Sequence, residues 1–159
     1  VGNYPGITVE KKQGSFKLDR VTKARILDLP GTYSLNASSI DESVVVELLL
    51  NKNDFDFPDV AVVVTDVENL KRNLLLFTQI KDLEIPTVLV INMSDQMKIK
   101  GIKINLEKLE EKLDTKVVLV STRLNSGIDE LKQSIVDYRS ISTDPLKKHA
   151  IEIEKKGKP

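Results

Sequence analysis

Cysteine is absent from the 159-residue sequence, and histidine occurs once. Disulfides and cysteine-based metal sites are therefore excluded, and a histidine-rich metal site is nearly excluded as well. A hard cation held by oxygen ligands stays compatible with this composition. The lack of cysteine agrees with a reducing cytoplasm but does not prove it.

The sequence also lacks a charge excess and a long hydrophobic run. Lys and Arg number 24 and Asp and Glu number 24, which argues against electrostatically driven nucleic-acid binding because that needs a basic face. The longest apolar runs, VAVVV at 60–64 and TVLVI at 87–91, fall far short of the roughly 18 residues of a membrane span. The first residues contain no hydrophobic region of a signal peptide, and the sequence does not begin with Met.

Hydrophobic patterning predicts alternating strands and helices. Apolar residues at 14–19 and 24–29 predict an antiparallel hairpin. The continuous apolar run at 59–66 is typical of a strand buried on both faces. Residues 1–7 are rich in glycine and proline and predict a loop. Further strands are predicted at 86–92 and 116–120, and helices at 39–50, 69–83, 105–113 and 127–138.

This order of elements indicates an α/β fold with a mostly parallel sheet flanked by helices. In open α/β sheets, ligands bind beyond the carboxyl ends of the strands. The residues that follow each predicted strand are therefore the first candidates for a functional site.

The second strand of the predicted hairpin is followed by a D-x-x-G motif, Asp28 to Gly31. An Asp at a strand end can hold Mg²⁺, directly or through water. A glycine three residues later lets a backbone N–H approach a phosphate oxygen, because no side chain is in the way. The same residue types are also favoured in ordinary turns, so a phosphate sensor and a plain turn both stay open.

An N-x-x-D motif follows the strand predicted at 86–92. The carboxylate of Asp95 can accept two hydrogen bonds from the N1–H and 2-amino groups of guanine, a pair that adenine does not offer. Asn92 can connect neighbouring loops and touch the base, and Met93 lies between them in the same predicted site. The alternative is a polar loop that caps the following segment.

Two more loops carry candidate residues. Ser121 and Thr122 follow the strand predicted at 116–120, where a small polar turn can present backbone N–H groups to the guanine oxygen; the alternative is a helix-capping loop. Near the start, Thr8 can offer its hydroxyl to Mg²⁺ and its N–H to a phosphate, or simply begin a strand. We expect these motifs to meet at one edge of a single sheet, because their order is hard to explain as separate accidents.

The sequence resembles a known family, the cytoplasmic GTPase domain of bacterial ferrous iron transport protein B. The resemblance covers residues 1 to about 138, and its most specific parts are the first fourteen residues and the D-x-x-G segment. The matching segments are VGNYPGITVEKKQG (1–14), DLPGTYSL (28–35), NLKRNLLLFTQIKDLEIP (69–86), NMSD (92–95) and VSTRLNSGIDEL (120–131).

The resemblance implies a Ras-like P-loop GTPase fold that binds GTP or GDP with Mg²⁺, and with K⁺ as a stimulating ion. It places Thr8 in the first switch and Asp28 to Gly31 in the second, so that Thr8 and Asp28 hold Mg²⁺ while Thr8 and Gly31 act catalytically around the terminal phosphate. Asn92, Met93 and Asp95 would bind guanine, with Ser121 and Thr122 in support. The implied partner is the permease part of the same parent protein, at the cytoplasmic face of the inner membrane.

One family motif is missing. The phosphate-binding loop G-x-x-x-x-G-K-[ST], which cradles the phosphates, does not occur in this sequence. We expect a strand–loop–helix unit of about 30 residues to precede residue 1 in the parent, and the isolated chain to bind nucleotide poorly. We also expect a truncated GTPase domain at 1–139 and a polar tail, or the start of a helical spacer, at 140–159.

The residue that follows D-x-x-G predicts slow GTP hydrolysis. Many GTPases orient the attacking water with a Gln just after this motif, whereas Thr32 stands here and is too short to copy a Gln amide. Two alternatives to a regulatory transporter GTPase stay open: a soluble GTPase of another Ras-like branch, and a protein-interaction domain that no longer binds nucleotide.

Overall fold

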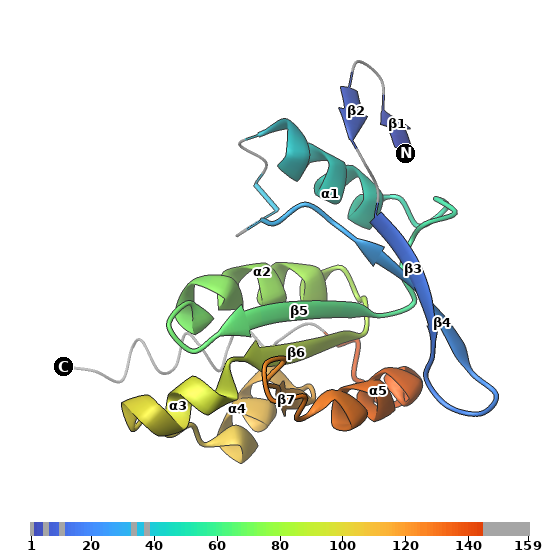
Figure 1. Cartoon of the computed structure of the whole chain (residues 1–159). Helices are drawn as coiled ribbons and strands as arrows, with labels where there is room; N and C mark the ends of the chain where they lie inside the picture. The colour runs from blue at the N-terminus through green and yellow to red at the C-terminus, as the bar shows by residue number, and fades with distance from the viewer. Residues whose placement is uncertain (1, 5–6, 10–11, 33–34, 37–38, 145–159) are drawn as a thin grey trace.

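The computed structural model describes residues 2–4, 7–9, 12–32, 35–36 and 39–144 (Figure 1). The tail predicted at 140–159 lies outside these residues from 145 onward. The elements of the described chain are β1 (Gly2–Tyr4), β2 (Ile7–Val9), β3 (Lys12–Lys17), β4 (Lys23–Asp28), α1 (Ile40–Leu50), β5 (Ala61–Asp66), α2 (Leu70–Asp82), β6 (Thr87–Asn92), α3 (Ser94–Lys100), α4 (Leu106–Leu113), β7 (Val117–Leu119), α5 (Ile128–Val136) and a 3₁₀ turn, η1 (Tyr138–Ser140).

A parallel sheet in the order β5-β6-β7 forms the centre of the larger half of the molecule. Successive residues of β6 point to opposite faces, and both faces are covered. On one face Phe77 of α2 is completely buried in a cluster with Leu89 and Ile91. The other cluster comprises Val88, Val90, Val118 and Val120, packed by Ile128, Leu131 and Ile141. The prediction of an α/β fold with a parallel sheet is confirmed.

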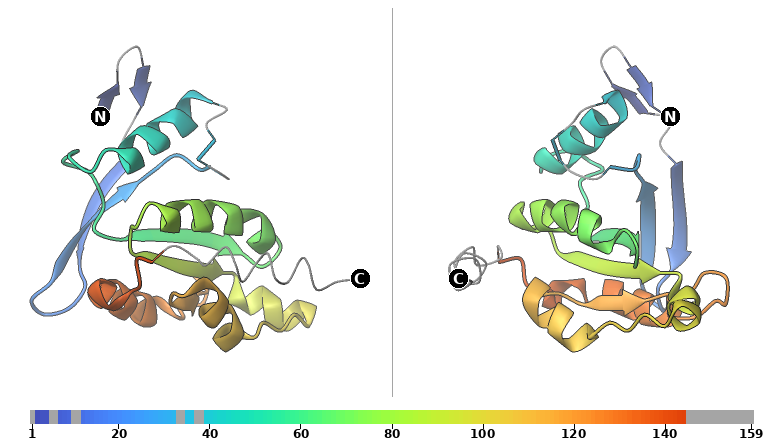
Figure 2. Two further views of the ribbon diagram at one scale, coloured as in Figure 1. Left: turned by 180° about the vertical axis from the view of Figure 1, so that it is seen from behind. Right: turned by 90° about the vertical axis from the view of Figure 1, so that its left-hand side faces the viewer.

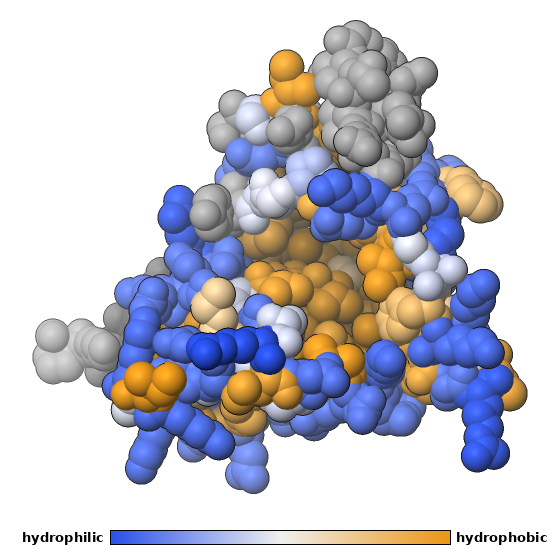
Figure 3. Space-filling model, viewed as in Figure 1, coloured by the Kyte–Doolittle hydropathy of each residue, from blue (hydrophilic) through white to orange (hydrophobic). Residues whose placement is uncertain are grey.

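The prediction that the first parallel strand is buried on both faces is wrong. Val63 and Thr65 of β5 are buried, but Val62 and Val64 on the opposite face are 38% and 60% exposed. The reason is position, since β5 lies at the edge of the three-stranded sheet and, among the described strands, is paired with β6 alone. Figure 3 shows an apolar hollow between α1 and β5. The edge of the parallel sheet is therefore open along an apolar face.

The predicted hairpin forms as a separate sheet. β3 and β4 pair antiparallel from Lys12 opposite Asp28 to Lys17 opposite Lys23. Asp19 closes the turn by accepting hydrogen bonds from the backbone N–H groups of Val21 (2.8 Å) and Thr22 (2.6 Å). The hairpin runs along the side of the molecule, with β1, β2 and α1 at one end and the parallel sheet at the other (Figures 1 and 2).

The first residues differ from the predicted loop. Gly2–Tyr4 forms β1 and pairs antiparallel with β2, so that Thr8 lies inside a strand opposite Asn3. Glycine and proline content misled the prediction because a very short hairpin also needs them. The predicted cap of α1 is confirmed, since the Ser39 hydroxyl accepts a 3.2 Å hydrogen bond from the Glu42 backbone N–H.

Two kinds of feature are absent from the described part of the chain. None of its helices is both long enough and apolar enough to cross a membrane. Nor do three or more His, Asp or Glu side chains gather there in a way that could hold a metal ion.

Candidate nucleotide-binding site

The carboxyl ends of β6 and β7 bring two of the predicted motifs together. The strands are parallel and in register at Ile91 and Leu119, so the loops that follow them leave from the same edge. The Ser94 backbone N–H donates a 3.1 Å hydrogen bond to the Val120 carbonyl, which joins the loops directly. Here the structure agrees with the predicted meeting of N-x-x-D and Ser-Thr.

The first of these loops is shaped by a left-handed residue. Met93 has φ 61° and ψ 36° and stands just before α3. A non-glycine residue in this region costs about 1–2 kcal/mol, so surrounding contacts must hold it there. The sharp turn starts α3 at Ser94 and places Asp95 in the first helical turn. The sequence predicted no helix here, because seven mostly polar residues carry no helical hydrophobic pattern.

Asp95 is held as a charged acceptor. Its Oδ1 accepts a 2.9 Å hydrogen bond from the Ser121 hydroxyl, and its Oδ2 lies 3.4 Å from the Gln96 amide nitrogen. The Ser121 hydrogen bond is the main reason that the pKa of Asp95 lies below its ordinary value, and the Gln96 contact and the positive charge of Arg123 act in the same direction. An ionised carboxylate in a fixed orientation is what recognition of two adjacent N–H groups requires.

The second loop, residues 121–126, closes on itself. Ser121 and Ser126 form an isolated bridge, and the buried Ser121 hydroxyl also accepts from the Leu124 backbone N–H at 3.2 Å. Asn92 reaches across from β6, where its Oδ1 accepts a 3.3 Å hydrogen bond from the Thr122 backbone N–H. This is the loop-connecting role predicted for Asn92.

Gly127 fixes where the second loop ends. Its φ is 80°, and a Cβ there would lie 2.1 Å from the Leu119 carbonyl oxygen. No other residue fits between β7 and the start of α5 without moving the backbone. The close approach keeps the loop directly above the end of β7.

The contacts of Asp66 are those of a structural residue. Its carboxylate accepts from the backbone N–H (2.9 Å) and the side-chain amide (3.1 and 3.0 Å) of Asn69, at the start of α2. These hydrogen bonds lower the pKa of Asp66. Asp66 also borders two cavities, of about 60 and 170 Å³, which lie next to the loop that follows β6. Both are lined by Met93, and the larger also by Asn92 and Asn73.

The phosphate-side candidates lie elsewhere. Asp28 ends β4, whose sheet is separate from that of β6 and β7, so the prediction that all motifs share one sheet edge is wrong. Gly31 is exposed, and a Cβ on it would meet no atom within 4 Å. Thr32 donates a 3.3 Å hydrogen bond to the Glu42 carboxylate. The Thr8 side chain lies outside the described atoms. The pattern misled the prediction because the strands at 23–28 and 61–66 follow one another along the chain, with α1 between them, but belong to different sheets.

The fold and the arrangement of loops define the class, an α/β domain with the fold of P-loop GTPases. The solved cytosolic domain of L. pneumophila FeoB matches with a TM-score of 0.79 and 37% identity, over 92% of this chain and 60% of that chain. The solved FeoB G-domain from Methanococcus jannaschii matches with a TM-score of 0.73 and 38% identity, over 84% of this chain and 83% of that chain.

Sequence comparison defines the family. The family model described as ferrous iron transport protein B matches residues 1–135, and the chain belongs to this family. It is 39% identical over 131 residues to the Fe(2+) transporter FeoB of Leptospira biflexa, covering 82% of this chain and 18% of the transporter. It is 40% identical over 151 residues to the Fe(2+) transporter FeoB of Legionella pneumophila, covering 92% of this chain and 19% of the transporter. The chain thus spans less than a fifth of the length of these transporters.

Proposed function

We propose that this chain is the guanine-recognising part of a regulatory GTPase domain in a ferrous iron transporter. The observation that carries the proposal is Asp95, a charged carboxylate held by Ser121 beside the cavities at Met93. Asp95 accepts the N1–H and 2-amino groups of guanine, while Asn92 holds the neighbouring loop through Thr122. Ser121 supports the base through Asp95, and Thr122 supports it by donating its backbone N–H to Asn92.

The phosphate side of the proposal rests on family membership and on three residues. Asp28 is exposed at the end of β4 and supplies a hard oxygen ligand suited to Mg²⁺, with the Thr8 hydroxyl as the second protein ligand. Gly31 is exposed and carries no side chain, so a phosphate oxygen can approach its backbone N–H. GTP hydrolysis would release the loops that carry Thr8 and Gly31, an order-to-disorder switch. Bound Mg²⁺ would neutralise phosphate charge, and K⁺ would assist where Thr32 replaces a glutamine.

The phosphate cradle itself must come from another segment of the parent. The open edge of β5 can accept one more parallel strand, and the exposed Val62 and Val64 would then be covered by the helix that follows it. Such a strand would also lie between β5 and the hairpin that carries Asp28. We propose that a strand–loop–helix unit fills this place and brings the two halves of the nucleotide site together.

The partner in this proposal is the permease part of the same parent, and the location is the cytoplasmic face of the membrane that holds it. Support comes from the relatives, since the matching solved structure is the cytosolic domain of L. pneumophila FeoB. A regulatory role follows from the switch loops, which change with the state of the nucleotide.

A titration with fluorescent GDP and ADP in Mg²⁺ and K⁺ tests the base site. The chain, its Asp95→Ala variant and an Asp129→Ala control are compared; Asp129 lies in the first turn of α5 and is likewise an acidic residue near a helix start. We expect weak binding that prefers GDP, lost in Asp95→Ala and kept in the control. The parent domain with its upstream segment should bind far more tightly with the same selectivity.

Two results would contradict the proposal. Equal affinity for GDP and ADP in the parent domain would show that Asp95 does not select the base. A folded parent domain that binds neither nucleotide would favour the alternative, a protein-interaction domain with the fold of a GTPase.

A further inference from the structure

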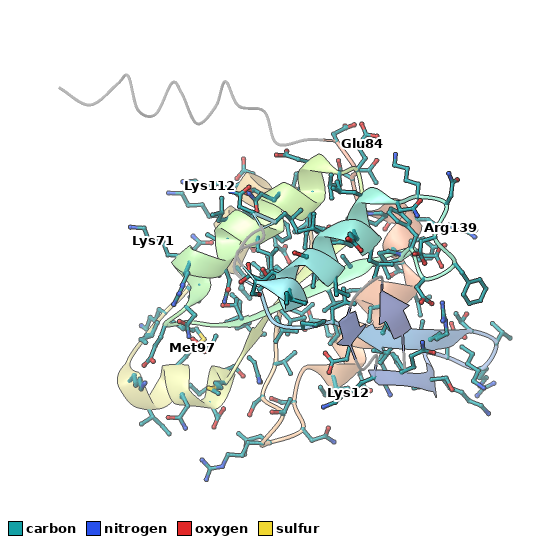
Figure 4. All side chains as sticks on the ribbon, turned by 90° about the horizontal axis from the view of Figure 1, so that it is seen from above. Lys12, Lys71, Glu84, Met97, Lys112 and Arg139 are labelled. Carbon is teal, nitrogen blue, oxygen red and sulfur yellow. The ribbon has the colours of Figure 1, made fainter. Side chains whose placement is uncertain are left out.

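The last turn of α2 carries a buried lysine that the nucleotide site does not use. Lys81 is 1% exposed, whereas Lys71 at the start of the same helix lies on the surface (Figure 4). Removing an ammonium group from water is costly unless hydrogen bonds replace the lost hydration. The contacts of Lys81 therefore have to explain why the charge is kept there.

Both described hydrogen bonds of Lys81 go to main-chain carbonyls. Its Nζ donates to the Asp114 oxygen at 3.0 Å and to the Ser142 oxygen at 2.9 Å, across 33 and 61 residues of sequence. Asp114 ends α4 in a left-handed conformation, and Ser142 lies shortly after η1. One ammonium group thus joins the end of α2, the turn before β7 and the segment that follows η1.

The segment that follows η1 is also packed against the core. Ile141 packs against the apolar cluster formed by Val88, Val90, Val118 and Val120 at β6 and β7. Its backbone N–H donates to the Tyr138 carbonyl at 3.1 Å. Ser142 in turn accepts from the Asp144 backbone N–H through its hydroxyl at 3.2 Å. Residues 141–144, which we call the exit segment, are therefore held at two points, by Ile141 and by Lys81.

The charges around Lys81 agree with a structural cation. Burial lowers the pKa of Lys81, while the nearby carboxylates of Asp114 and Asp144 oppose that shift. Asp144 belongs to the exit segment itself, so the attraction between its carboxylate and the ammonium group of Lys81 also holds this segment in place. The favourable charge partners come from the elements that Lys81 joins.

We propose that Lys81 is a positioning residue, a latch whose hydrogen bonds to Asp114 and Ser142 hold the exit segment against the ends of α2 and α4. The latch makes any movement of the end of α2 a movement of the exit segment too. This anchoring does not depend on bound nucleotide, because neither Lys81 nor its acceptors belong to the loops that follow β6 and β7.

Hydrogen exchange of the full chain tests the latch. In a Lys81→Met variant the exit segment loses its hydrogen-bonded anchor, so amides in 140–144 should exchange about ten-fold faster or more. Amides of β6 should be unchanged. The Lys71→Met control removes the same charge from the exposed start of α2 and should alter neither region.

The lack of cysteine allows a second test that separates the charge from packing. Lys81→Cys is alkylated in denaturant with bromoethylamine, which rebuilds an ammonium side chain of lysine length, or with propyl iodide, which gives a neutral side chain of similar shape. After refolding, the ammonium derivative should restore slow exchange in 140–144 and the neutral derivative should not. Equal exchange in the two derivatives, or faster exchange spread evenly over β6 and the exit segment, would overturn the proposal.

Discussion

The Ser121 hydroxyl lies 2.9 Å from Oδ1 of Asp95 and joins two loops that are 26 residues apart in sequence. Ser121 is 1% exposed, whereas Asp95 is half-buried. A buried donor therefore orients a partly exposed charge, which is how a binding group is fixed before its ligand arrives. The recognition of guanine proposed for Asp95 depends on this pair.

Ser121→Ala should weaken GDP binding in the parent domain by roughly 10- to 100-fold, because Asp95 loses the donor that orients it. The pKa of Asp95 should also rise toward its ordinary value, since Ser121 is the main cause of its lowering. Fluorescent GDP titrations over a pH series measure both effects. The control is Ser134→Ala, where the hydroxyl donates only to the Glu130 carbonyl within α5. Unchanged GDP affinity in Ser121→Ala would contradict the role given to the pair.

Asp66 should make stability depend on acid pH. Its hydrogen bonds from Asn69 lower its pKa in the folded protein, so the unfolded chain binds this proton more readily. The stabilisation is present above the unfolded pKa of about 4 and is lost as pH falls through the lower folded pKa. Urea unfolding should show Asp66→Asn less stable than the unaltered chain at neutral pH, with a difference that shrinks at acid pH. A difference that stays constant across this range would rule out the charge as its cause. Asp82→Asn, at the exposed end of α2, is the control.

Gly127→Ala should destabilise the protein by more than about 2 kcal/mol, since a Cβ at this left-handed position overlaps the Leu119 carbonyl. Gly101→Ala is a matched control, because Gly101 is also left-handed, with φ 68°, but has no atom within 4 Å of the added Cβ. Its cost should be about 1 kcal/mol. Urea unfolding of both variants measures the difference, and equal costs would mean that the close approach to β7 is relieved by a small shift.

Val64→Lys should change the free energy of unfolding differently in the isolated chain and in the parent domain. In the isolated chain Val64 is 60% exposed, so the change should fall within about 0.5 kcal/mol. In the parent, a strand and helix over this face would bury the lysine, and the free energy of unfolding should drop by about 2 kcal/mol or more. Ile99→Lys, on the exposed side of α3, should be mild in both. A mild effect of Val64→Lys in the parent would mean that nothing covers the open face of β5.

Thr32 should make GTP hydrolysis slow and dependent on K⁺. Its hydroxyl already donates to Glu42, and the side chain is too short to orient a water as a glutamine would. Replacing K⁺ with Na⁺ in the parent domain should therefore lower turnover by at least about ten-fold. A phosphate-release assay with both salts at equal ionic strength measures this. Fast turnover that is the same in K⁺ and Na⁺ would be incompatible with the expectation.

The sequence by itself determined the alternation of strands and helices over most of the chain and the positions of the candidate motifs. The strands at 61–66 and 87–92 and the helix at 70–82 followed from local hydrophobic patterns, which depend only on neighbours in the chain. The N-x-x-D motif and the Ser-Thr loop were found because each directly follows such a strand. The family also followed from short segments of sequence, and the match over residues 1–135 confirmed it.

Only the tertiary structure decided how these pieces meet. The left-handed Met93 and the short helix α3 arise from contacts with the Val120 loop, and no local pattern encodes them. The same holds for the open edge of β5, which depends on which strand pairs with which. Lys81 is the extreme case, since a lysine in a helix is ordinarily solvated. Its burial follows from acceptors 33 and 61 residues away, at distances in sequence that hydrophobic periodicity does not reach.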